Sequence, residues 1–231
     1  MGDTDREHKE TAHYSSPPCA SSELEVDHLW HPAGPPTQAQ DVPSWRRAER
    51  QRLRGLRMAI SATERHMLAV QLAQHLQQLL ARHMEGTRTP VVSAYWPIKG
   101  ELDLRPLMTE LYNAGTEIAL PVVETRAAPL VFRRWTPATR MVRGDWNIPV
   151  PPADAPEQTP DILLAPCVGW SADGYRLGYG GGYFDRTLAS LNSAPIVIGI
   201  GLLQSRIATI HPQPHDIRLD MIMTEQGVAN T

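Results

Sequence analysis

The chain is poor in cysteine, with only Cys19 and Cys167 among its 231 residues. Two cysteines cannot form the disulfide framework of a small secreted protein, so we expect a reducing compartment and predict a cytoplasmic location. Cys167 has no histidine beside it in the sequence. We therefore expect its thiol to be a small packed side chain rather than a nucleophile.

Long apolar runs are missing as well. The longest, Ile196 to Leu203, is far too short to cross a bilayer, and the first residues lack the apolar core of a secretory signal. Acidic residues near the start argue against a mitochondrial transit peptide. A formal net charge of −3 gives no general reason to expect nucleic acid or an anionic membrane as a partner.

Residues 1–43 show no apolar periodicity and are interrupted by prolines at positions 17, 18, 32, 35, 36 and 43. Such a segment cannot bury enough apolar surface to offset the entropy of ordering it, so we predict a disordered tail. The remainder, residues 44–231, has the length and composition of one globular domain. We expect this domain to be monomeric.

Apolar strands alternate with amphipathic helices along the domain. Helices are predicted from near Ser44, from the capping box Ser61–Glu64 to about His83, and over residues 104–114 and 183–191. Strands are predicted over residues 90–95, 117–123, 161–165, 196–201 and 220–223, with an edge strand over 130–135. This alternation predicts an α/β fold: a central, mostly parallel sheet with helices on both faces.

A glycine-rich stretch between residues 166 and 186 dominates the sequence. It follows the apolar strand 161–165, precedes a helix, and contains glycines at positions 174, 178, 180, 181 and 182. Successive N–H groups in such a loop, together with the positive end of the next helix, favour an anion. Arg176 adds a planar cation, and Asp185 places a carboxylate in the first helical turn, where it could hold Mg²⁺. The stretch therefore predicts a triphosphate–Mg²⁺ cradle.

Two familiar phosphate loops are excluded by the spacing. A Walker A loop needs Lys and Ser or Thr directly after its glycines, and a Rossmann loop starting at Gly178 would need glycine where Tyr183 stands. The remaining alternative is a glycine-rich surface turn. For the helix beginning near Ser44, which carries Arg46 and Arg50 four residues apart, the residues alone favour a solvated basic face.

The run R-L-G-Y-G-G-G-Y-F-D-R, residues 176–186, closely resembles the signature of the 5-formyltetrahydrofolate cyclo-ligase family, and the likeness extends over about residues 45–225. Trp170, Ser171 and Phe184 depart from the residues usual in that family. The resemblance implies a fold similar to ribose-phosphate isomerases and coenzyme A transferases. It also reverses the interpretation of the first helix, because Arg46 and Arg50 match positions that contact ATP.

The resemblance further implies roles for individual residues. ATP would contact Arg46, Arg50 and the loop residues Arg176, Leu177, Gly178, Tyr179, Gly180, Gly181, Gly182, Tyr183 and Phe184. Catalysis would depend on Arg176 and Tyr183. The folate substrate would contact Trp96, Glu101, Trp146 and Tyr183, although Trp146 could equally pack its own loop. Magnesium would be held by Asp185 and Asp216, with Asp220 as the alternative to Asp216.

The expected function is therefore the ATP- and Mg²⁺-dependent cyclisation of 5-formyltetrahydrofolate to 5,10-methenyltetrahydrofolate, with release of ADP and phosphate. Its partners would be these small molecules. A sugar-phosphate isomerase of the same fold would instead use the glycine loop for a monoester phosphate and Glu101 as a base. A non-catalytic nucleotide-binding regulator is the third possibility.

Overall fold

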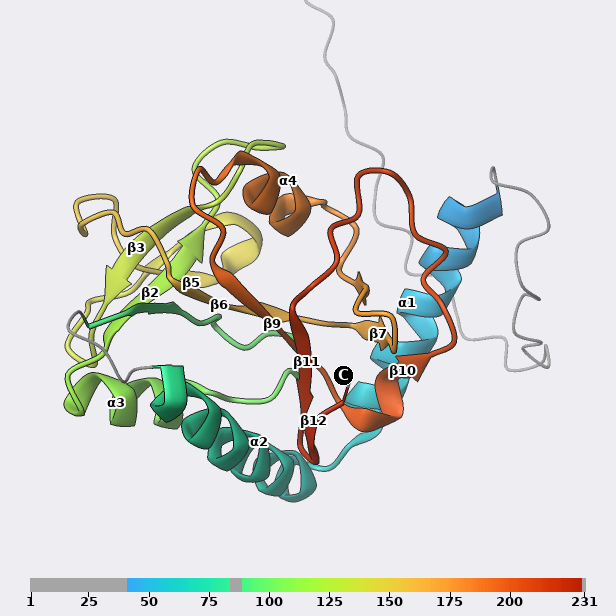
Figure 1. Ribbon diagram of the computed structural model, residues 1–231, viewed down its shortest axis with the longest axis horizontal. Helices are drawn as coiled ribbons and strands as arrows, with labels where there is room; N and C mark the ends of the chain where they lie inside the picture. Colours follow the sequence, from blue (N-terminus) through green and yellow to red (C-terminus); the bar gives the residue numbers. More distant parts are fainter. Residues whose placement is uncertain (1–40, 84–88, 230–231) are drawn as a thin grey trace, which may run out of the picture. The chain divides into compact units, whose positions relative to one another are not determined.

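The computed structural model describes residues 41–83 and 89–229, so the predicted tail lies almost entirely outside the described residues. A seven-stranded sheet has the order β12-β11-β9-β6-β1-β2-β3. Its strands are β1 (Val91–Ser93), β2 (Glu117–Val122), β3 (Val131–Trp135), β6 (Ile162–Pro166), β9 (Ile196–Ile200), β11 (Met221–Thr224) and β12 (Gly227–Val228). The five strands from β11 to β2 are mutually parallel, and β3 and β12 run antiparallel at the two edges. The predicted mostly parallel sheet and its edge strand β3 are confirmed (Figure 1).

Alternate residues of the strands enter separate apolar layers, as the two-residue period of a strand requires. Along β6, Ile162 and Leu164 pack with α2 (Ala62–His83) and α3 (Arg105–Asn113), whereas Leu163 packs on the opposite face. There the sheet is covered by α4 (Tyr183–Ser190), through Phe184 and Leu188. Helices therefore cover both faces, as predicted (Figure 1).

The glycine-rich stretch contains more regular structure than the sequence indicated. After β6 the chain forms a hairpin of β7 (Gly169–Ser171) and β8 (Arg176–Leu177), joined by a turn at Asp173 and Gly174, where Gly174 has φ +85°. β10 (Arg206–Ile207) pairs with β7 in parallel. Arg176 and Leu177 therefore lie in a strand, and the loop proper begins at Gly178.

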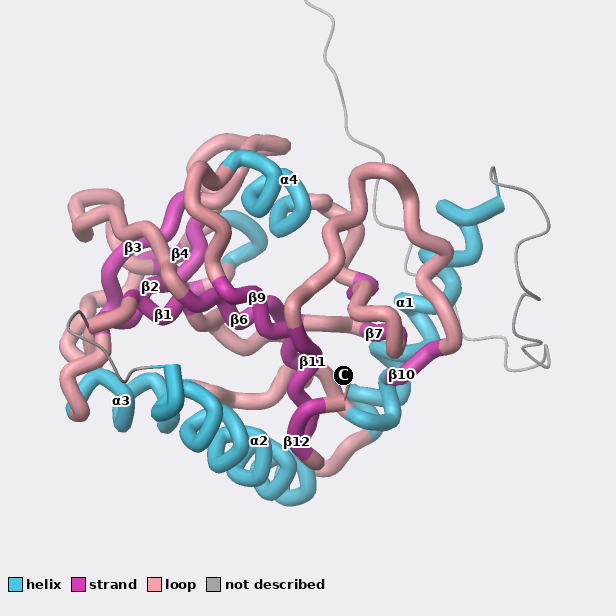
Figure 2. Tube along the Cα trace, viewed as in Figure 1, coloured by secondary structure: helices cyan, strands magenta, loops and turns pink. Residues whose placement is uncertain are grey.

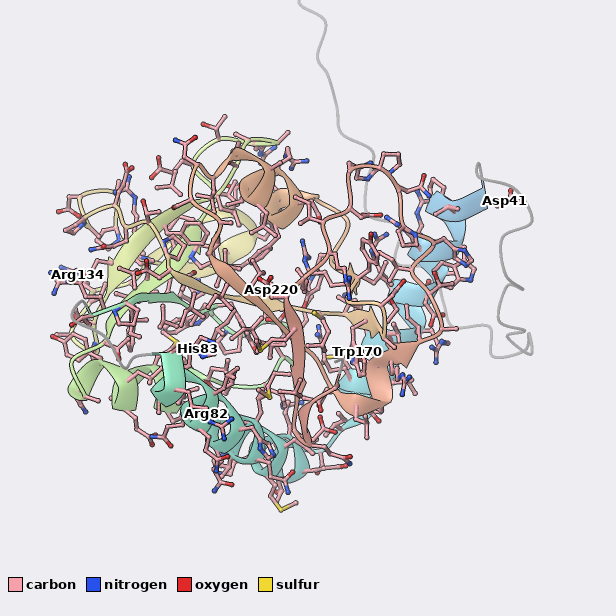
Figure 3. The ribbon with its side chains drawn as sticks, in the orientation of Figure 1. Asp41, Arg82, His83, Arg134, Trp170 and Asp220 are labelled. Carbon is pink, nitrogen blue, oxygen red and sulfur yellow. The ribbon has the colours of Figure 1, made fainter. Side chains whose placement is uncertain are left out.

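The first helix, α1 (Val42–Ala59), packs on this small sheet through Leu53, which lies in one buried apolar cluster with Leu177. Trp170 in β7 is fully buried, and its indole N–H donates to the Leu202 carbonyl over 2.8 Å (Figure 3). The small sheet thereby joins α1 to the main sheet. None of the helices within residues 41–83 and 89–229 has a stretch long and apolar enough to span a membrane.

Two further short elements complete the described chain. A hairpin of β4 (Val142–Arg143) and β5 (Pro149–Val150) encloses the 3-10 turn Asp145–Asn147, which carries Trp146. A second 3-10 turn, Leu203–Ser205, follows β9. Loops gather between α1 and α4 (Figure 2), and there Arg46 of α1 and Asp185 of α4 both contact the segment Asp216–Ile217.

Candidate functional site

A narrow pocket, here called the Glu101 pocket, lies beyond the carboxyl ends of β1, β6 and β9. Glu101, Cys167 and Gly201, which follow these three strands, all line it, as does Arg57 from α1. This edge is where open α/β sheets bind ligands. The pocket encloses about 20 Å³, room for about one water molecule, and its rim includes the exposed side chains of Leu56 and Gln204. A larger ligand can therefore enter only if such rim side chains move.

Glu101 is a buried carboxylate that accepts two hydrogen bonds and lies beside one guanidinium group. Its Oε2 accepts the backbone N–H of Ile98 over 2.9 Å, and its Oε1 accepts the hydroxyl of Tyr179 over 2.8 Å. The guanidinium of Arg57 lies 4.0 Å from Oε1. Burial raises the pKa of Glu101, and these neighbours oppose that rise. The pocket therefore contains an oriented acceptor for a ligand's N–H groups.

Burial also decides the chemistry of Cys167. It raises the pKa of the Cys167 thiol to about 12, so this side chain remains a protonated thiol near neutral pH. That agrees with the expectation of a packed side chain without a nucleophilic role.

A second, larger cavity runs along α1 and is here called the arginine groove. It has a volume of about 680 Å³, within the range of small-molecule sites. It is lined by α1, the glycine loop and the loop around Gln213, through residues that include Arg46, Arg47, Arg50, Arg54, Tyr179, Gly180 and His215. Four arginines of one helix therefore line one cavity. Arg46 among them is buried, so this helix does not present a fully solvated basic face.

The arginines of the groove differ in what they contact. Arg46 is buried; its Nη atoms bind the carboxylate of Asp216, and its Nε donates to the Ile210 carbonyl over 2.9 Å. Arg50 donates from Nε to the carbonyl of Gly178 over 2.7 Å. Burial and the charge of Arg46 lower the pKa of Arg50. Crowded guanidinium groups with too few counter-charges are the electrostatic signature of an anion site.

The glycine loop lies against these arginines and ends in α4. Gly180 has φ +97°, and a Cβ placed there would come within 3.3 Å of the guanidinium carbon of Arg50. Any larger residue would therefore be strained and would crowd the groove. Gly182 is the N-cap of α4 and provides no side-chain cap, so the N–H groups of the first turn keep their affinity for an anion. A Cβ at Gly178 would clash with Arg176, and one at Gly181 with the ring of Tyr183.

Arg176 and Asp185 form an ion pair between β8 and α4. The Nη2 of Arg176 lies 3.0 Å from Oδ2 of Asp185, and the Arg176 side chain is 5% exposed. The same guanidinium stacks on the ring of Phe184, 4.9 Å from its centroid. Leu177 is buried in the small apolar cluster under α1, so only its backbone is available to a ligand.

The two predicted metal ligands lie on adjoining segments. Oδ1 of Asp185 accepts the N–H of Ile217 over 3.3 Å, and Ile217 directly follows Asp216. Burial raises the pKa of Asp216, but the hydrogen bonds from Arg46 and from the Gln213 N–H outweigh it and hold that pKa below its usual value. The alternative residue, Asp220 (Figure 3), instead accepts the N–H of Val197 over 2.7 Å. This hydrogen bond fixes the start of β9, so the role of Asp220 is structural.

The aromatic residues predicted at the site separate into two groups. Trp146 is 66% exposed, and its ring meets that of the half-buried Tyr183 edge-on at 5.6 Å, so these two form one aromatic corner. Trp96 is half-buried against the α2–α3 layer, with the guanidinium of Arg105 5.1 Å above its ring. Trp96 does not line the Glu101 pocket.

Sequence reasoning missed Arg54 and Arg57. The Nε of Arg54 is buried and has no hydrogen-bond partner within residues 41–83 and 89–229. Arg57 is buried beside Glu101. For Arg57 the sequence did contain an indication. The spacing of four, three and four residues places it on the same helical face as Arg46, Arg50 and Leu53.

Comparisons with known proteins agree on one family. Residues 42–225 match the model of the 5-formyltetrahydrofolate cyclo-ligase family. The chain is 35% identical over 134 residues to the 5-formyltetrahydrofolate cyclo-ligase of Escherichia coli K12, covering 54% of this chain and 73% of the relative. It is 22% identical over 205 residues to the mouse protein of that name, covering 83% and 99%. The solved structure of Aquifex aeolicus 5,10-methenyltetrahydrofolate synthetase superposes with a TM-score of 0.67 at 28% identity, over 79% of this chain and 91% of that one.

Proposed function

The chain belongs to the 5-formyltetrahydrofolate cyclo-ligase family, and we propose how its residues carry out the reaction: ATP binds in the arginine groove and the folate at the Glu101 pocket. The observation that carries this assignment is the position of the glycine loop. Tyr179 from that loop lines the arginine groove and also donates to Glu101 over 2.8 Å. One short loop therefore contacts both cavities, as a transfer between two substrates requires.

The reaction needs a better leaving group than the oxygen of the formyl amide. We propose that the formyl oxygen attacks the γ-phosphorus of ATP, so that ADP leaves and a phosphorylated imidate forms. N10 then attacks the formyl carbon, phosphate departs with the former formyl oxygen, and N10 loses its proton. The protein must position the two substrates and stabilise charge on the transferring group. A covalent enzyme intermediate is not required, which agrees with the protonated state of Cys167.

The arginine groove supplies the charge that a triphosphate needs. Arg46 is largely neutralised by Asp216, which leaves Arg47, Arg50 and Arg54 as the groove's excess positive charge. The loop amides and the first turn of α4 add hydrogen-bond donors. Arg176, fixed by Asp185 and Phe184, would lie next to the transferring phosphoryl group.

Magnesium fits this donor set in the form typical of ATP sites. No group of three or more His, Cys, Asp or Glu residues that could hold a metal occurs in the described part of the chain. Mg²⁺, however, commonly takes one or two carboxylates and completes its shell with phosphate oxygens and water. Asp185 and Asp216 are the carboxylates that would hold it. Bound there, it would neutralise charge on the phosphates, and Arg46 and Arg176 would have to share the carboxylates with the metal.

The folate would be recognised through its N–H groups. A 2-amino-4-oxo ring presents neighbouring N–H donors, and Glu101 offers two buried oxygens with lone pairs beyond those used by Ile98 and Tyr179. The aromatic corner of Trp146 and Tyr183 could cover the remaining aromatic surface. Trp96 does not line the pocket, so it would contribute to folate binding only through the residues that pack next to it.

The function is tested by an absorbance assay. The purified protein with ATP, MgCl₂ and 5-formyltetrahydrofolate should generate the near-ultraviolet absorbance of the methenyl product, and omission of ATP should abolish it. A sugar-phosphate isomerase or a nucleotide-binding regulator would generate no such absorbance with or without ATP. The family comparisons give no support to either of these alternatives.

Arg54→Gln should raise the KM for ATP about tenfold and change the KM for the folate less than twofold, because a charge-assisted phosphate contact is worth at least about 1.4 kcal/mol. Initial rates with each substrate varied in turn measure both constants. Arg52→Gln is the matched control on the same helix, since Arg52 pairs with Glu49 and does not line the groove. Equal KM values for ATP in the two variants would remove Arg54 from the nucleotide site.

A further inference from the structure

Three side chains from distant parts of the sequence form one hydrogen-bonded network between the two cavities. The Tyr179 hydroxyl accepts from Nη2 of Arg57 over 2.5 Å and donates to Oε1 of Glu101 over 2.8 Å. The Nε of Arg57 donates to the carbonyl of Lys99 over 3.1 Å, which fixes the guanidinium. Arg57 and Glu101 line the Glu101 pocket, whereas Tyr179 lines the arginine groove.

The member of the network that can move is Tyr179. It is 36% exposed and stands between Gly178 and Gly180, whereas the side chains of Arg57 and Glu101 are only 7% and 5% exposed. Glycine on both sides leaves its backbone the freedom to adopt a second loop conformation. A ligand whose phosphates bind the N–H groups of this loop must select one conformation, and the structure shows one in which the Tyr179 hydroxyl reaches Glu101.

The presence of Tyr179 changes what Glu101 can offer. A buried carboxylate that loses a hydrogen-bond donor is harder to keep ionised and less fixed in direction. With the Tyr179 hydroxyl in place, Glu101 is a fixed anionic acceptor for the N–H donors of a folate ring. Fixing the loop should therefore strengthen folate binding, and by linkage the folate should strengthen nucleotide binding equally.

We propose that Arg57 and Tyr179 are positioning residues that couple the two substrate sites, so that a nucleotide on the glycine loop raises the affinity of Glu101 for the folate. The proposal rests on the function proposed above. The role proposed for Arg57 and the Tyr179 hydroxyl is to link the two cavities, which neither cavity needs in order to bind its own ligand. The coupling runs through protein contacts and is independent of any contact between the γ-phosphate and the formyl group.

The test measures binding without catalysis. ADP with MgCl₂ lacks the γ-phosphate and cannot react, so titration calorimetry of 5-formyltetrahydrofolate with and without saturating ADP isolates coupling through the protein. We expect ADP to tighten folate binding at least about fivefold in the unaltered protein. In Tyr179→Phe, which keeps the ring and removes the hydroxyl, this ratio should fall to below about twofold.

Two further variants test whether the effect is specific to the Tyr179 hydroxyl and to the guanidinium of Arg57. Tyr175→Phe removes the same group four residues earlier, where the hydroxyl has no partner within the described residues and the ring packs in a small apolar cluster; it should retain the full ratio. Arg57→Lys keeps the charge but lacks the fork that reaches both Lys99 and Tyr179, and it should lose most of the ratio.

The outcomes separate this inference from the proposed function. If the unaltered protein binds both ligands with no effect of ADP on the folate, or if Tyr179→Phe retains the full ratio, the coupling role is wrong and the proposed function is unaffected. If the unaltered protein binds neither ligand, the proposed sites are wrong. A loss of coupling in Tyr175→Phe as large as in Tyr179→Phe would also contradict the coupling role of the network, because it would show that any loss of a tyrosine hydroxyl in this stretch disturbs the loop.

Discussion

Asp185→Asn should lose at least about a hundredfold in kcat, equivalent to roughly 2.7 kcal/mol of transition-state stabilisation. Asp185 is proposed to help hold Mg²⁺, which would neutralise charge on the phosphates, and to fix Arg176, its partner at 3.0 Å. Charge on the bridging oxygens grows during phosphoryl transfer, so both effects matter more in the transition state than in bound ATP. Steady-state kinetics at several Mg²⁺ concentrations should show partial recovery at high Mg²⁺.

Asp220→Asn is the matched control for this experiment. Asp220 accepts the Val197 N–H over 2.7 Å and is the carboxylate that the sequence could not distinguish from Asp216 as a ligand. Its variant should melt at a lower temperature yet keep kcat within about threefold and the same Mg²⁺ dependence. If instead Asp185→Asn showed only a lower melting temperature, Asp185 would serve merely to neutralise the buried Arg176.

Glu101→Gln should lower kcat/KM for 5-formyltetrahydrofolate by about a hundredfold and change the KM for ATP less than threefold. The substitution replaces a buried anionic acceptor by a neutral amide in the presence of Arg57 and Tyr179. Hydrogen bonds to a buried charge are worth about 1.5–3 kcal/mol, and the amide would present a donor where the ligand needs an acceptor. Equal losses for both substrates would indicate a general folding defect, which the melting temperature would reveal.

The pH dependence provides an independent measurement on Glu101. Burial raises the pKa of Glu101 above its ordinary value. If the ionised form binds the folate, kcat/KM for the folate should be constant above that raised pKa and fall as the pH drops through it, at a less acidic pH than for an exposed glutamate. This acid limb should be absent in Glu101→Gln. Persistence of an identical limb in the variant would assign the titration to another group.

Much of the fold was predictable because its signals are local. The capping box at Ser61 is a real N-terminus, since the Ser61 hydroxyl accepts the N–H of Glu64 over 3.2 Å and α2 begins at Ala62. The apolar strands around Leu163 and Ile198 lie in the interior of the sheet. The β7–β8 hairpin was missed because the glycines that follow it led us to predict the whole stretch as one loop. The Asp173–Gly174 dipeptide is nevertheless a recognised hairpin signal.

The site was less predictable, because its contacts join residues far apart in the chain. The motif and the resemblance selected Arg50, Glu101 and Asp185, but the pairing of Arg46 with Asp216 joins positions 170 residues apart. Arg57 was passed over as one of several arginines on a helix, and its burial beside Glu101 depends on how α1 packs. Helical periodicity indicates which residues share a face, and tertiary packing alone decides what that face meets.

The central claim, that ATP activates the formyl oxygen between the arginine groove and the Glu101 pocket, is tested most directly by an isotope measurement. The protein is given 5-formyltetrahydrofolate carrying ¹⁸O in the formyl group, with unlabelled ATP and MgCl₂, and the released phosphate is analysed by mass spectrometry. The account predicts one ¹⁸O atom in each phosphate for each methenyl product formed. Unlabelled phosphate, with the ¹⁸O recovered in water, would contradict it.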